Sequence, residues 1–445
     1  MPTRLKLVSP TTDFRRVALR GRVRPVRGAT FEHWVGKRSS VMASTNAGDL
    51  PFQRWHRFKE AFDPELIARA VRESPRPVRN LADPFGGSGT SALAAQFLGV
   101  TPTTVEVNPF LADVIQAKVA TYHVPTLISA LTHVCGVSRR SRSQAAAMID
   151  ALPATFIEPG VKGRWLFDHE VALEILRLRT AILQLEDASI ARLFRVILGG
   201  LMTSFSNATV SGKGRRYRVN WETRPVDPRI VLAAFSDAAA AAIAEIDMFA
   251  DRPVLEATVL CADSRAVFET LGPVDLIVCS PPYPNSFDYT DVYNLELWML
   301  GYLGSTQDNR ALRQSTLTSH VQVSRTFAAA PSTPTLNRTM KALHSSASQL
   351  WDHRIPAMVG GYFADLLKLL RGSAHLLPPG GQAWFVVGDS QYARVRIQVA
   401  RILAELAPRA GFDIKYTTPF RSMRVSPQQS GRPGLSEDLV VMTRR

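Results

Sequence analysis

The four residues Ser280-Pro281-Pro282-Tyr283 combine types that suit a planar ligand bearing an amine. They follow the apolar run 274–279, whose length and β-branched content are typical of a buried parallel strand. Because proline lacks an N–H and has a fixed φ, Pro281 and Pro282 end that strand in a stiff segment of carbonyl acceptors. A hydroxyl precedes these acceptors and an aromatic ring follows them. The sequence therefore predicts a binding site for an amino-bearing ring at this point of the chain.

A second candidate site is a glycine-rich turn that joins a predicted strand, 78–85, to a predicted helix. The turn spans residues 86–90, and the spacing Gly87-x-Gly89-x-x-Ala92 is that of a dinucleotide-type fingerprint. In such a fingerprint the glycines let the backbone approach a ligand, and the N-terminus of the helix faces that ligand. No Gly-Lys-Ser/Thr sequence follows, so the turn is not a phosphate-binding P-loop.

Acidic residues end two further predicted strands. Glu106 lies at the end of the strand at 102–107, about 20 residues after Gly87, where an acidic side chain binds the hydroxyls of a ribose. Asp263 ends the strand at 255–263 in the same way. For Glu106 the plainer alternative is an exposed acid at a strand end, without a ligand.

The composition favours a nucleic-acid partner. The 445 residues are 46% hydrophobic, enough for a large core in two or three domains or in one enlarged domain. With 53 Lys and Arg against 38 Asp and Glu, the net charge of +15 favours a polyanion, although an arginine-rich proteome gives the same balance without a partner. Three cysteines without metal-ligand spacing predict no metal site and a reduced, cytoplasmic protein. No apolar stretch reaches the ~18 residues of a membrane-spanning helix, and the basic N-terminus lacks the apolar region of a secretory signal.

Two basic segments are candidates for contacts with nucleic acid. Residues 1–50 form a basic N-terminal arm, with ten Lys and Arg against two acidic residues among the first 38. Such an arm either tracks phosphates or is a solvated tail. The second segment, 211–218, is predicted to be a glycine-flexible loop, with a plain solvated loop as the alternative. Its candidate contact residues are Lys213, Arg215, Arg216, Tyr217 and Arg218.

The order of strands and helices predicts an α/β fold. Segments 51–110 and 251–445 alternate between strand and helix, which is typical of a mostly parallel sheet with crossover helices. Between them, 111–250 shows helical spacing almost throughout and is predicted to be a helical insertion. A polar segment rich in Ser, Thr, Ala and Pro, 304–355, is predicted to be a second insertion, partly mobile, inside the catalytic domain.

Taken together, these stretches resemble the amino-group DNA methyltransferases, which act on cytosine N4 or adenine N6. Residues 83–90, DPFGGSGT, look like their cofactor motif, and Ser280-Pro281-Pro282-Tyr283 looks like their catalytic motif. The resemblance covers about 51–110, 255–300 and 360–445. It implies a Rossmann-like fold with a large helical insertion, S-adenosyl-L-methionine as methyl donor, and double-stranded DNA as partner. The glycine motif precedes the proline motif, and the insertion at 111–250 is longer than a simple crossover, so it is the first candidate for target recognition, with 304–355 second.

The resemblance also implies roles for particular residues. Glu106 would bind the ribose hydroxyls, Asp263 would accept from the adenine amino group, and Asp83 with its neighbours would surround the methionine part. Phe58, Lys59 and Phe62 fall where the first cofactor segment of the family lies. The complete set of expected cofactor-binding residues is Phe58, Lys59, Phe62, Asp83, Pro84, Phe85, Gly87, Ser88, Gly89, Thr90, Glu106, Asn108 and Asp263.

The chemistry of an exocyclic amine agrees with this set. Its lone pair is delocalised into the ring, so hydrogen bonds from the amine to Ser280 Oγ and the Pro281 carbonyl would make the nitrogen more tetrahedral and more nucleophilic. A sulfonium methyl group is already activated, so in-line displacement needs mainly positioning. The base must leave the duplex to reach the site, where Tyr283 would stack on it. Cys279 precedes the prolines and is interpreted as a core residue, not as a nucleophile.

The first residue of the motif bears on the target base. Within the resemblance, serine favours cytosine N4, whereas Asp or Asn favours adenine N6, so Ser280 favours cytosine. The alternatives are an adenine-N6 DNA methyltransferase, an RNA guanine-N2 methyltransferase, and a catalytically inactive nucleic-acid-binding protein. A dinucleotide oxidoreductase would leave Ser280–Tyr283 unused. A restriction or defence-system partner is compatible with the DNA enzyme, although nothing in the chain resembles a nuclease.

Overall fold

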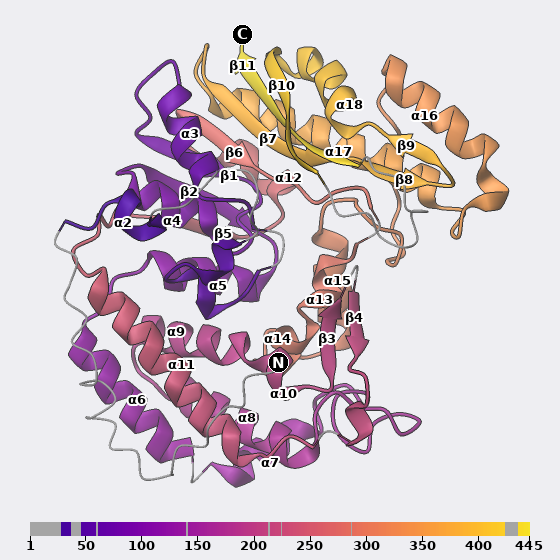
Figure 1. Ribbon diagram of the computed structural model, residues 1–445. Helices are drawn as coiled ribbons and strands as arrows, with labels where there is room; N and C mark the ends of the chain where they lie inside the picture. The colour runs from indigo at the N-terminus through magenta and orange to yellow at the C-terminus, as the bar shows by residue number, and fades with distance from the viewer. Residues whose placement is uncertain are drawn as a thin grey trace.

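The computed structural model describes residues 28–36, 46–58, 61–138, 141–211, 214–223, 225–285, 287–422 and 435–445. Two predicted site residues, Lys59 and Lys213, lie outside the described residues, as does most of the basic arm at 1–50. The described chain forms one seven-stranded sheet with helices on both faces, and a separate layer of helices lies below it in Figure 1. The α/β fold class predicted from the sequence is confirmed.

The sheet has the order β10-β11-β7-β6-β1-β2-β5. The five strands from β7 to β5 run parallel to one another, and β11 is antiparallel to both of its neighbours. The strands are β1 Asn80–Asp83, β2 Thr101–Glu106, β5 Thr258–Cys261, β6 Leu276–Cys279, β7 Gln382–Gly388, β10 Phe412–Ser422 and β11 Ser436–Arg444.

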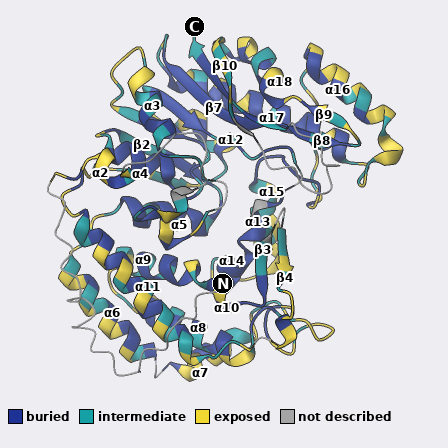
Figure 2. Ribbon diagram, in the orientation of Figure 1, coloured by how far each residue is buried: buried dark blue, intermediate teal, exposed yellow. Residues whose placement is uncertain are grey.

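Alternation along the central strands builds a core on each face of the sheet. In β6, Leu276 and Val278 point into one core, whereas Ile277 and Cys279 point into the other, as the two-residue period of a strand requires. The first core is covered by α3 Glu65–Glu73, α4 Thr90–Phe97 and α5 Pro109–Val119. The second is covered by α17 Ile355–Leu376 and α18 Val399–Leu406, with the short helix α12 Ser264–Val267 beside them. Figure 2 shows the sheet buried between these layers.

A helical layer occupies most of the predicted insertion at 111–250 and is attached to the sheet domain where α5 packs against α9. Its helices are α6 Val124–Ser138, α7 Arg142–Ile149, α8 His169–Leu183, α9 Ala188–Gly200, α10 Met202–Phe205 and α11 Arg229–Met248.

The predicted loop at 211–218 is, in its described part, one arm of a β-hairpin. Strands β3 Ala208–Ser211 and β4 Gly214–Tyr217 pair from Ala208 with Tyr217 to Ser211 with Gly214. The β-branched residues Thr209 and Val210, and the tyrosine at the end of β4, favour extended structure more strongly than the flanking glycines oppose it.

The remaining elements join these layers. After β6 the chain forms α13 Tyr289–Val292, α14 Asn294–Met299, α15 Thr306–Ser315 and α16 Pro334–Ser345, so two helices lie in the predicted polar insertion at 304–355. In Figure 1, α13 and α15 lie between the sheet and the β3–β4 hairpin. The short elements are α2 Phe31–Val35, β8 Ser390–Tyr392, β9 Val395–Ile397, η1 Asn46–Asp49, η2 Gln53–Trp55, η3 Trp221–Thr223, η4 Phe268–Thr270, η5 Ala347–Gln349 and η6 Ala407–Ala410.

The strand order contains a reversal beside β1. From β1 the chain moves outward through β2 to β5, then returns to β6 on the other side of β1 and moves outward through β7. In open α/β sheets, ligands bind at the carboxyl ends of the strands at such a reversal. None of the described helices is both long and apolar enough to cross a membrane.

Candidate active site

The two sequence motifs meet at the reversal of the strand order. Strands β1 and β6 pair in parallel, with Ala82 opposite Ile277, so both motifs leave the same edge of the sheet side by side. Cys279 is fully buried, and burial, followed by the charge of Asp83, raises the pKa of its thiol well above the usual value. A buried neutral thiol is inert, which agrees with its interpretation as a core residue.

Asp83 is buried at the end of β1 with both carboxylate oxygens hydrogen-bonded. Oδ1 accepts from the backbone N–H of Phe85 at 2.9 Å, and Oδ2 accepts from the Ser91 hydroxyl at 2.5 Å. Burial raises the pKa of Asp83 to about 6, although these hydrogen bonds oppose the shift. Asp83 therefore holds the start of the turn, and its carboxyl group faces inward.

The glycine turn closes over Glu106. Gly87, with φ +51°, donates its backbone N–H to Glu106 Oε2 at 2.8 Å, and Asn108 donates its own to Oε1 at 2.8 Å. A Cβ at Gly87 would lie 3.2 Å from Cζ of Phe58, so the ring of Phe58 rests on the turn. Burial raises the pKa of Glu106 to about 7, against these two backbone hydrogen bonds. The structure thus brings together the predicted residues Phe58, Gly87, Glu106 and Asn108.

Four other predicted cofactor residues lie around the glycine turn or in the core. The Asn108 side chain caps α5 by accepting from the backbone N–H groups of Phe110 and Leu111. Phe62 is half-buried against the larger core. Ser88 and Thr90 are buried at the start of α4, with their hydroxyl oxygens 3.5 Å apart.

Lys118 hydrogen-bonds to the backbone of the glycine turn. It was not predicted from the sequence as a site residue. It is fully buried on α5, and its ammonium group donates to the Ser88 carbonyl at 2.6 Å and to Oε1 of Gln53 at 2.7 Å. Burial lowers the pKa of Lys118 to about 7. In the sequence it is one lysine in an otherwise ordinary helix, so no local signal marked it.

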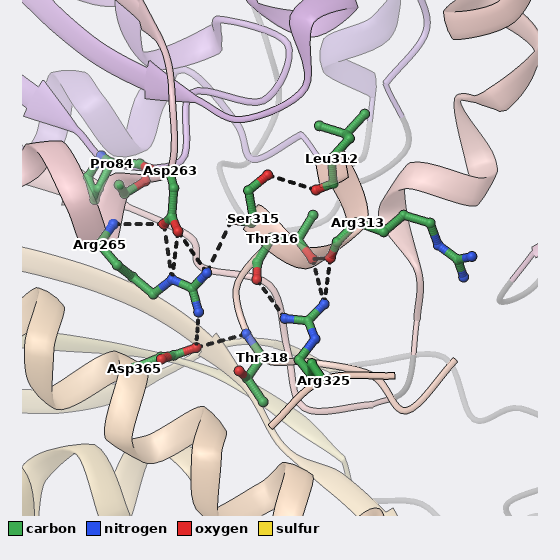
Figure 3. A network of polar contacts seen from close by, with 11 residues as sticks. Pro84, Asp263, Arg265, Leu312, Arg313, Ser315, Thr316, Thr318, Arg325 and Asp365 are labelled. Carbon is green, nitrogen blue, oxygen red and sulfur yellow. Dashed lines mark hydrogen bonds and ion pairs between the residues drawn. The ribbon is translucent and has the colours of Figure 1, made fainter. Parts of the chain in front are cut away.

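The end of β5 is joined directly to the end of β1. The hydroxyl group of Ser264 donates to the Pro84 carbonyl, which places the neighbouring Asp263 beside the glycine motif. The Asp263 carboxylate is held by the guanidinium of Arg265, with Nη2 2.7 Å from Oδ2 (Figure 3). Arg265 was also missed, because its role depends on residues that are far away in the sequence.

The proline motif holds its tyrosine against a neighbouring strand. The hydroxyl oxygens of Ser280 and Tyr283 lie 3.2 Å apart. A Cβ at Gly388, the last residue of β7, would lie 2.5 Å from Cε2 of Tyr283, so the ring rests directly on that backbone. The Tyr392 hydroxyl donates to the Pro284 carbonyl at 3.0 Å and fixes the chain just beyond the motif.

The basic hairpin lies beside the helix that follows this motif, because β4 packs against α13. Nη2 of Arg215 is 3.8 Å from Oδ1 of Asp291 on α13, and its guanidinium lies 5.9 Å from the ring centroid of Phe156. Arg218 donates to the carbonyls of Thr203 and Ser206. Arg216 is exposed to solvent.

Tyr217 contacts a basic turn at 161–164, which was not predicted from the sequence to bind nucleic acid. Its ring packs against Trp221, and the guanidinium of Arg164 lies 5.8 Å from the Tyr217 ring centroid. Arg164 and Lys162 are both exposed on that turn. The turn at 161–164 therefore contacts the hairpin through Arg164 and Tyr217.

The residues at the strand ends fit an S-adenosyl group better than a phosphate group. Three carboxyl groups, those of Asp83, Glu106 and Asp263, lie at the ends of adjacent strands. Carboxylates accept from hydroxyls and amines and favour a cationic ligand, whereas a pyrophosphate would be repelled. Gly87 takes a left-handed conformation, with φ +51°, that glycine adopts without strain. Within the described parts of the chain, no group of His, Cys, Asp and Glu has the arrangement of a metal site.

Comparison with known proteins agrees with this arrangement. No protein-family model matches the chain. It is 22% identical over 433 residues to the type II methyltransferase M.BsoBI of Geobacillus stearothermophilus, which covers 85% of this chain and 82% of that protein. It is also 22% identical over 395 residues to the type II methyltransferase M.AvaI of Nostoc, covering 82% of this chain and 80% of that protein. This chain is similar to these type II methyltransferases over most of its length, and it is an S-adenosylmethionine-dependent methyltransferase.

Two solved structures share a weaker likeness with this methyltransferase. TrmN from Thermus thermophilus is 12% identical, with a TM-score of 0.27, over 86% of this chain and 49% of that chain. The rRNA methyltransferase aviRa from Streptomyces viridochromogenes is 11% identical, with a TM-score of 0.28, over 93% of this chain and 96% of that chain. These likenesses are too weak to identify a fold. The fold of this methyltransferase is identified as Rossmann-like from its own strand order.

The residues that the sequence predicts for cofactor binding and for methyl transfer lie along one edge of the sheet. When bound, S-adenosylmethionine supplies a methyl group activated by a sulfonium sulfur. The glycine turn, Glu106 and Asp263, the expected cofactor side, follow β1, β2 and β5, and Ser280–Tyr283, the expected acceptor side, follows β6. Because β1 and β6 pair in parallel, the two motifs leave the same edge of the sheet side by side, where ligands bind in open α/β sheets.

Proposed function

We propose that this methyltransferase transfers a methyl group to the exocyclic amine of a flipped base in double-stranded DNA, and that the target is cytosine N4. The observation that carries the proposal is the position of Ser280 and Pro281 at the carboxyl end of β6, next to the glycine turn of β1. A hydroxyl oxygen and a carbonyl oxygen in a stiff segment are acceptors for the two hydrogens of an amine.

The chain's own residues would prepare the amine. Ser280 Oγ and the Pro281 carbonyl accept its hydrogens and draw the nitrogen lone pair out of the ring toward the methyl carbon. A C–N bond forms as the C–S bond breaks, and the amine releases one proton to water. Tyr283, fixed on Gly388, would provide the surface on which the base stacks. Base–aromatic stacking contributes about 1–3 kcal/mol and tolerates any base, so Tyr283 does not choose the target.

The preference for cytosine over adenine follows from Ser280. In the family that the chain resembles, a serine in the first position of the motif favours methylation of cytosine N4. Both bases carry the same amine on a planar ring, so adenine N6 is the second candidate.

The choice of DNA is supported by exposed cations on the β3–β4 hairpin and on the turn that contacts it. Lys162, Arg164 and Arg216 are exposed, and strand β4 of the hairpin packs on α13, which follows the proline motif. Exposed cations track phosphates without reading sequence. Both relatives carry the name type II methyltransferase, and a restriction or defence-system partner is part of the same proposal.

The decisive experiment is methyl transfer from labelled S-adenosylmethionine to double-stranded DNA, single-stranded DNA and RNA of mixed sequence, followed by nucleoside analysis. We expect N4-methylcytosine in double-stranded DNA, formed at least ~100-fold more slowly by the Tyr283→Ala variant. If the label appears on adenine N6, then adenine and not cytosine is the target. If it appears on guanine N2 in RNA, the substrate is RNA and not DNA. A protein that binds DNA and S-adenosylhomocysteine but labels no polymer would be a binding protein without catalysis.

A further inference from the structure

Asp263 is held by Arg265 in a two-pronged ion pair (Figure 3). Oδ1 of Asp263 accepts from the backbone N–H of Arg265 at 2.9 Å and from its Nε at 3.0 Å, while Oδ2 accepts from Nη2 at 2.7 Å. Only 24% of the Asp263 side chain and 18% of the Arg265 side chain are exposed. A planar guanidinium bonded along one edge of a carboxylate fixes its orientation and leaves its other lone pairs to accept from a ligand.

The same guanidinium reaches the polar insertion. Nη1 of Arg265 donates to Oδ2 of Asp365 on α17 at 2.8 Å, and Nη2 donates to the Ser315 carbonyl at 3.3 Å. Oδ2 of Asp365 also accepts from the backbone N–H of Thr318 at 2.9 Å. Arg265 therefore ties the end of β5 to the chain at 315–318, about fifty residues later in the sequence.

Arg325 closes this part of the insertion into a compact segment. Its Nη1 donates to the Thr316 carbonyl at 2.8 Å, and its Nη2 donates to the Arg313 carbonyl at 2.6 Å. Figure 3 shows its guanidinium facing these carbonyl groups, on the same segment that Arg265 contacts. Residues 313–325 are thus held together by arginine bonds to their own backbone, and the segment can act as a rigid link.

The other end of the link reaches the chain that follows the catalytic motif. The side chain of Arg313 donates from Nε to Oδ2 of Asp288 at 2.8 Å, and its Nη2 bonds to the same oxygen. Asp288 is buried and caps α13, accepting from the backbone N–H and the hydroxyl of Thr290. It lies five residues after Tyr283. The 313–325 segment is therefore bonded both to Arg265, which holds Asp263, and to Asp288, which follows the proline motif.

We propose that Arg265 and Arg313 are positioning residues at the two ends of this link, with Arg265 orienting Asp263 for the cofactor and Arg313 fixing the chain beyond Tyr283 for the base. The inference rests on the proposed function, because it takes Asp263 as the acceptor for the adenine amino group and Ser280–Tyr283 as the site of transfer. Neither arginine needs to touch the reacting atoms.

Arginine-to-lysine variants test the link, because lysine keeps the charge and loses the planar fork. With Arg265→Lys we expect the Kd for S-adenosylhomocysteine, measured by calorimetry, to rise about tenfold, while kcat at saturating cofactor changes less than about threefold. With Arg313→Lys we expect the opposite split, a cofactor Kd within about twofold of the wild type and a kcat lowered at least ~10-fold by the misplaced acceptor side.

The chain contains a matched control in Arg229, which forms the same fork with Asp227, two residues before it, on the surface. Arg229→Lys should leave both constants unchanged. Asp365→Asn tests the same role without changing Arg265 or Asp263, because it weakens the ion pair between Arg265 and Asp365. We expect it to raise the Kd for S-adenosylhomocysteine by at least ~3-fold.

Hydrogen exchange supplies a readout that does not depend on activity. In the wild type, S-adenosylhomocysteine should slow exchange at backbone amides of 313–325 and of 287–292, and in Arg265→Lys the slowing at 313–325 should be lost. If Arg265→Lys and Asp365→Asn both keep the wild-type cofactor Kd and the same protection, the positioning role is wrong. Absence of DNA methylation by a wild type that still shows these cofactor effects would instead contradict the proposed function alone.

Discussion

The hydroxyl oxygen of Tyr283 lies 3.2 Å from that of Ser280, so the aromatic residue that ends the motif also contacts the residue that begins it. This contact is made across two prolines, whose fixed φ angles curve the segment and keep it stiff. The Tyr283 ring is held from its other side by the backbone of Gly388. The position of the Ser280 hydroxyl, and with it the expected hydrogen bond to the target amine, therefore depends on Tyr283.

The first prediction separates the hydroxyl of Tyr283 from its ring. Tyr283→Phe keeps the ring on Gly388 and removes only the contact with Ser280, so we expect kcat to fall about tenfold, the value of one hydrogen bond. Tyr283→Ala also removes the stacking surface, and we expect a loss of at least ~100-fold. Steady-state methylation of DNA measures both.

Binding of S-adenosylhomocysteine is the control for both Tyr283 variants, because the cofactor residues lie on other strands. Its Kd should stay within about twofold of the wild type. A cofactor Kd that rises as much as kcat falls would show that Tyr283 supports the cofactor side instead.

The second prediction concerns the backbone under the Tyr283 ring. In Gly388→Ala the new Cβ would lie 2.5 Å from Cε2 of Tyr283, so the ring must shift. We expect kcat to fall about 100-fold, since displacement of a substrate-positioning group by ~1 Å has that effect. Gly272→Ala is the matched control, because a Cβ there meets nothing within 4 Å. Equal activity of the two alanine variants would contradict the proposed position of the ring.

The third prediction is a pH dependence of cofactor binding. Burial raises the pKa of Glu106 to about 7, and a carboxylate that accepts from ribose hydroxyls must be ionised. We therefore expect the Kd for S-adenosylhomocysteine to rise about tenfold between pH 8 and pH 6, measured by calorimetry at constant ionic strength. Glu106→Gln should bind weakly at pH 8 and show a flat profile. A flat profile in the wild type would exclude Glu106 as an ionised ligand.

The same shift predicts the stability of the protein without cofactor. The pKa of Glu106 is higher in the folded state than the usual value of 4.5, so the folded state holds the proton over the range between them. The contribution of Glu106 to stability should therefore fall as the pH rises from about 4.5 through about 7. The Tm of the wild type minus that of Glu106→Gln should be larger near pH 5.5 than near pH 7.5, because groups common to both proteins cancel in this difference.

The fourth prediction distinguishes two neighbouring arginines on the basic hairpin. Arg216 is exposed, so Arg216→Ala should weaken DNA binding and make the slope of log K against log salt less negative by about one, with an unchanged Tm. Arg218 donates to the carbonyls of Thr203 and Ser206. Arg218→Ala should therefore destabilise the fold by about 1–3 kcal/mol, because it leaves those carbonyls without these bonds. If both variants change only the salt slope, Arg218 is also a phosphate contact.

The motifs at the strand ends could be predicted because their signals are local. Paired prolines stop a strand, and closely spaced glycines make a turn, whatever the rest of the chain does. The regular alternation of strand and helix likewise predicted a parallel sheet, and the structure confirms it. The hairpin at 208–217 was missed because its glycines suggested a flexible loop, whereas pairing across the turn favours strands.

The partners of the site residues could not be predicted, because they come from distant parts of the chain. Tyr283 rests on Gly388, and Lys118 supports Ser88 from another helix. Neither pair shares a sequence pattern.

What the sequence by itself determined is the chemistry available at each strand end: a stiff set of acceptors beside a ring, a glycine turn, and acids after two strands. Only the tertiary structure decided that these ends lie side by side at one edge of the sheet, because the strand order places β6 and β2 on either side of β1. It also decided that Arg265 and Arg313 link the two sides through 313–325. The physical reason is that hydrogen bonds and packing act over a few ångströms in space, regardless of separation along the chain.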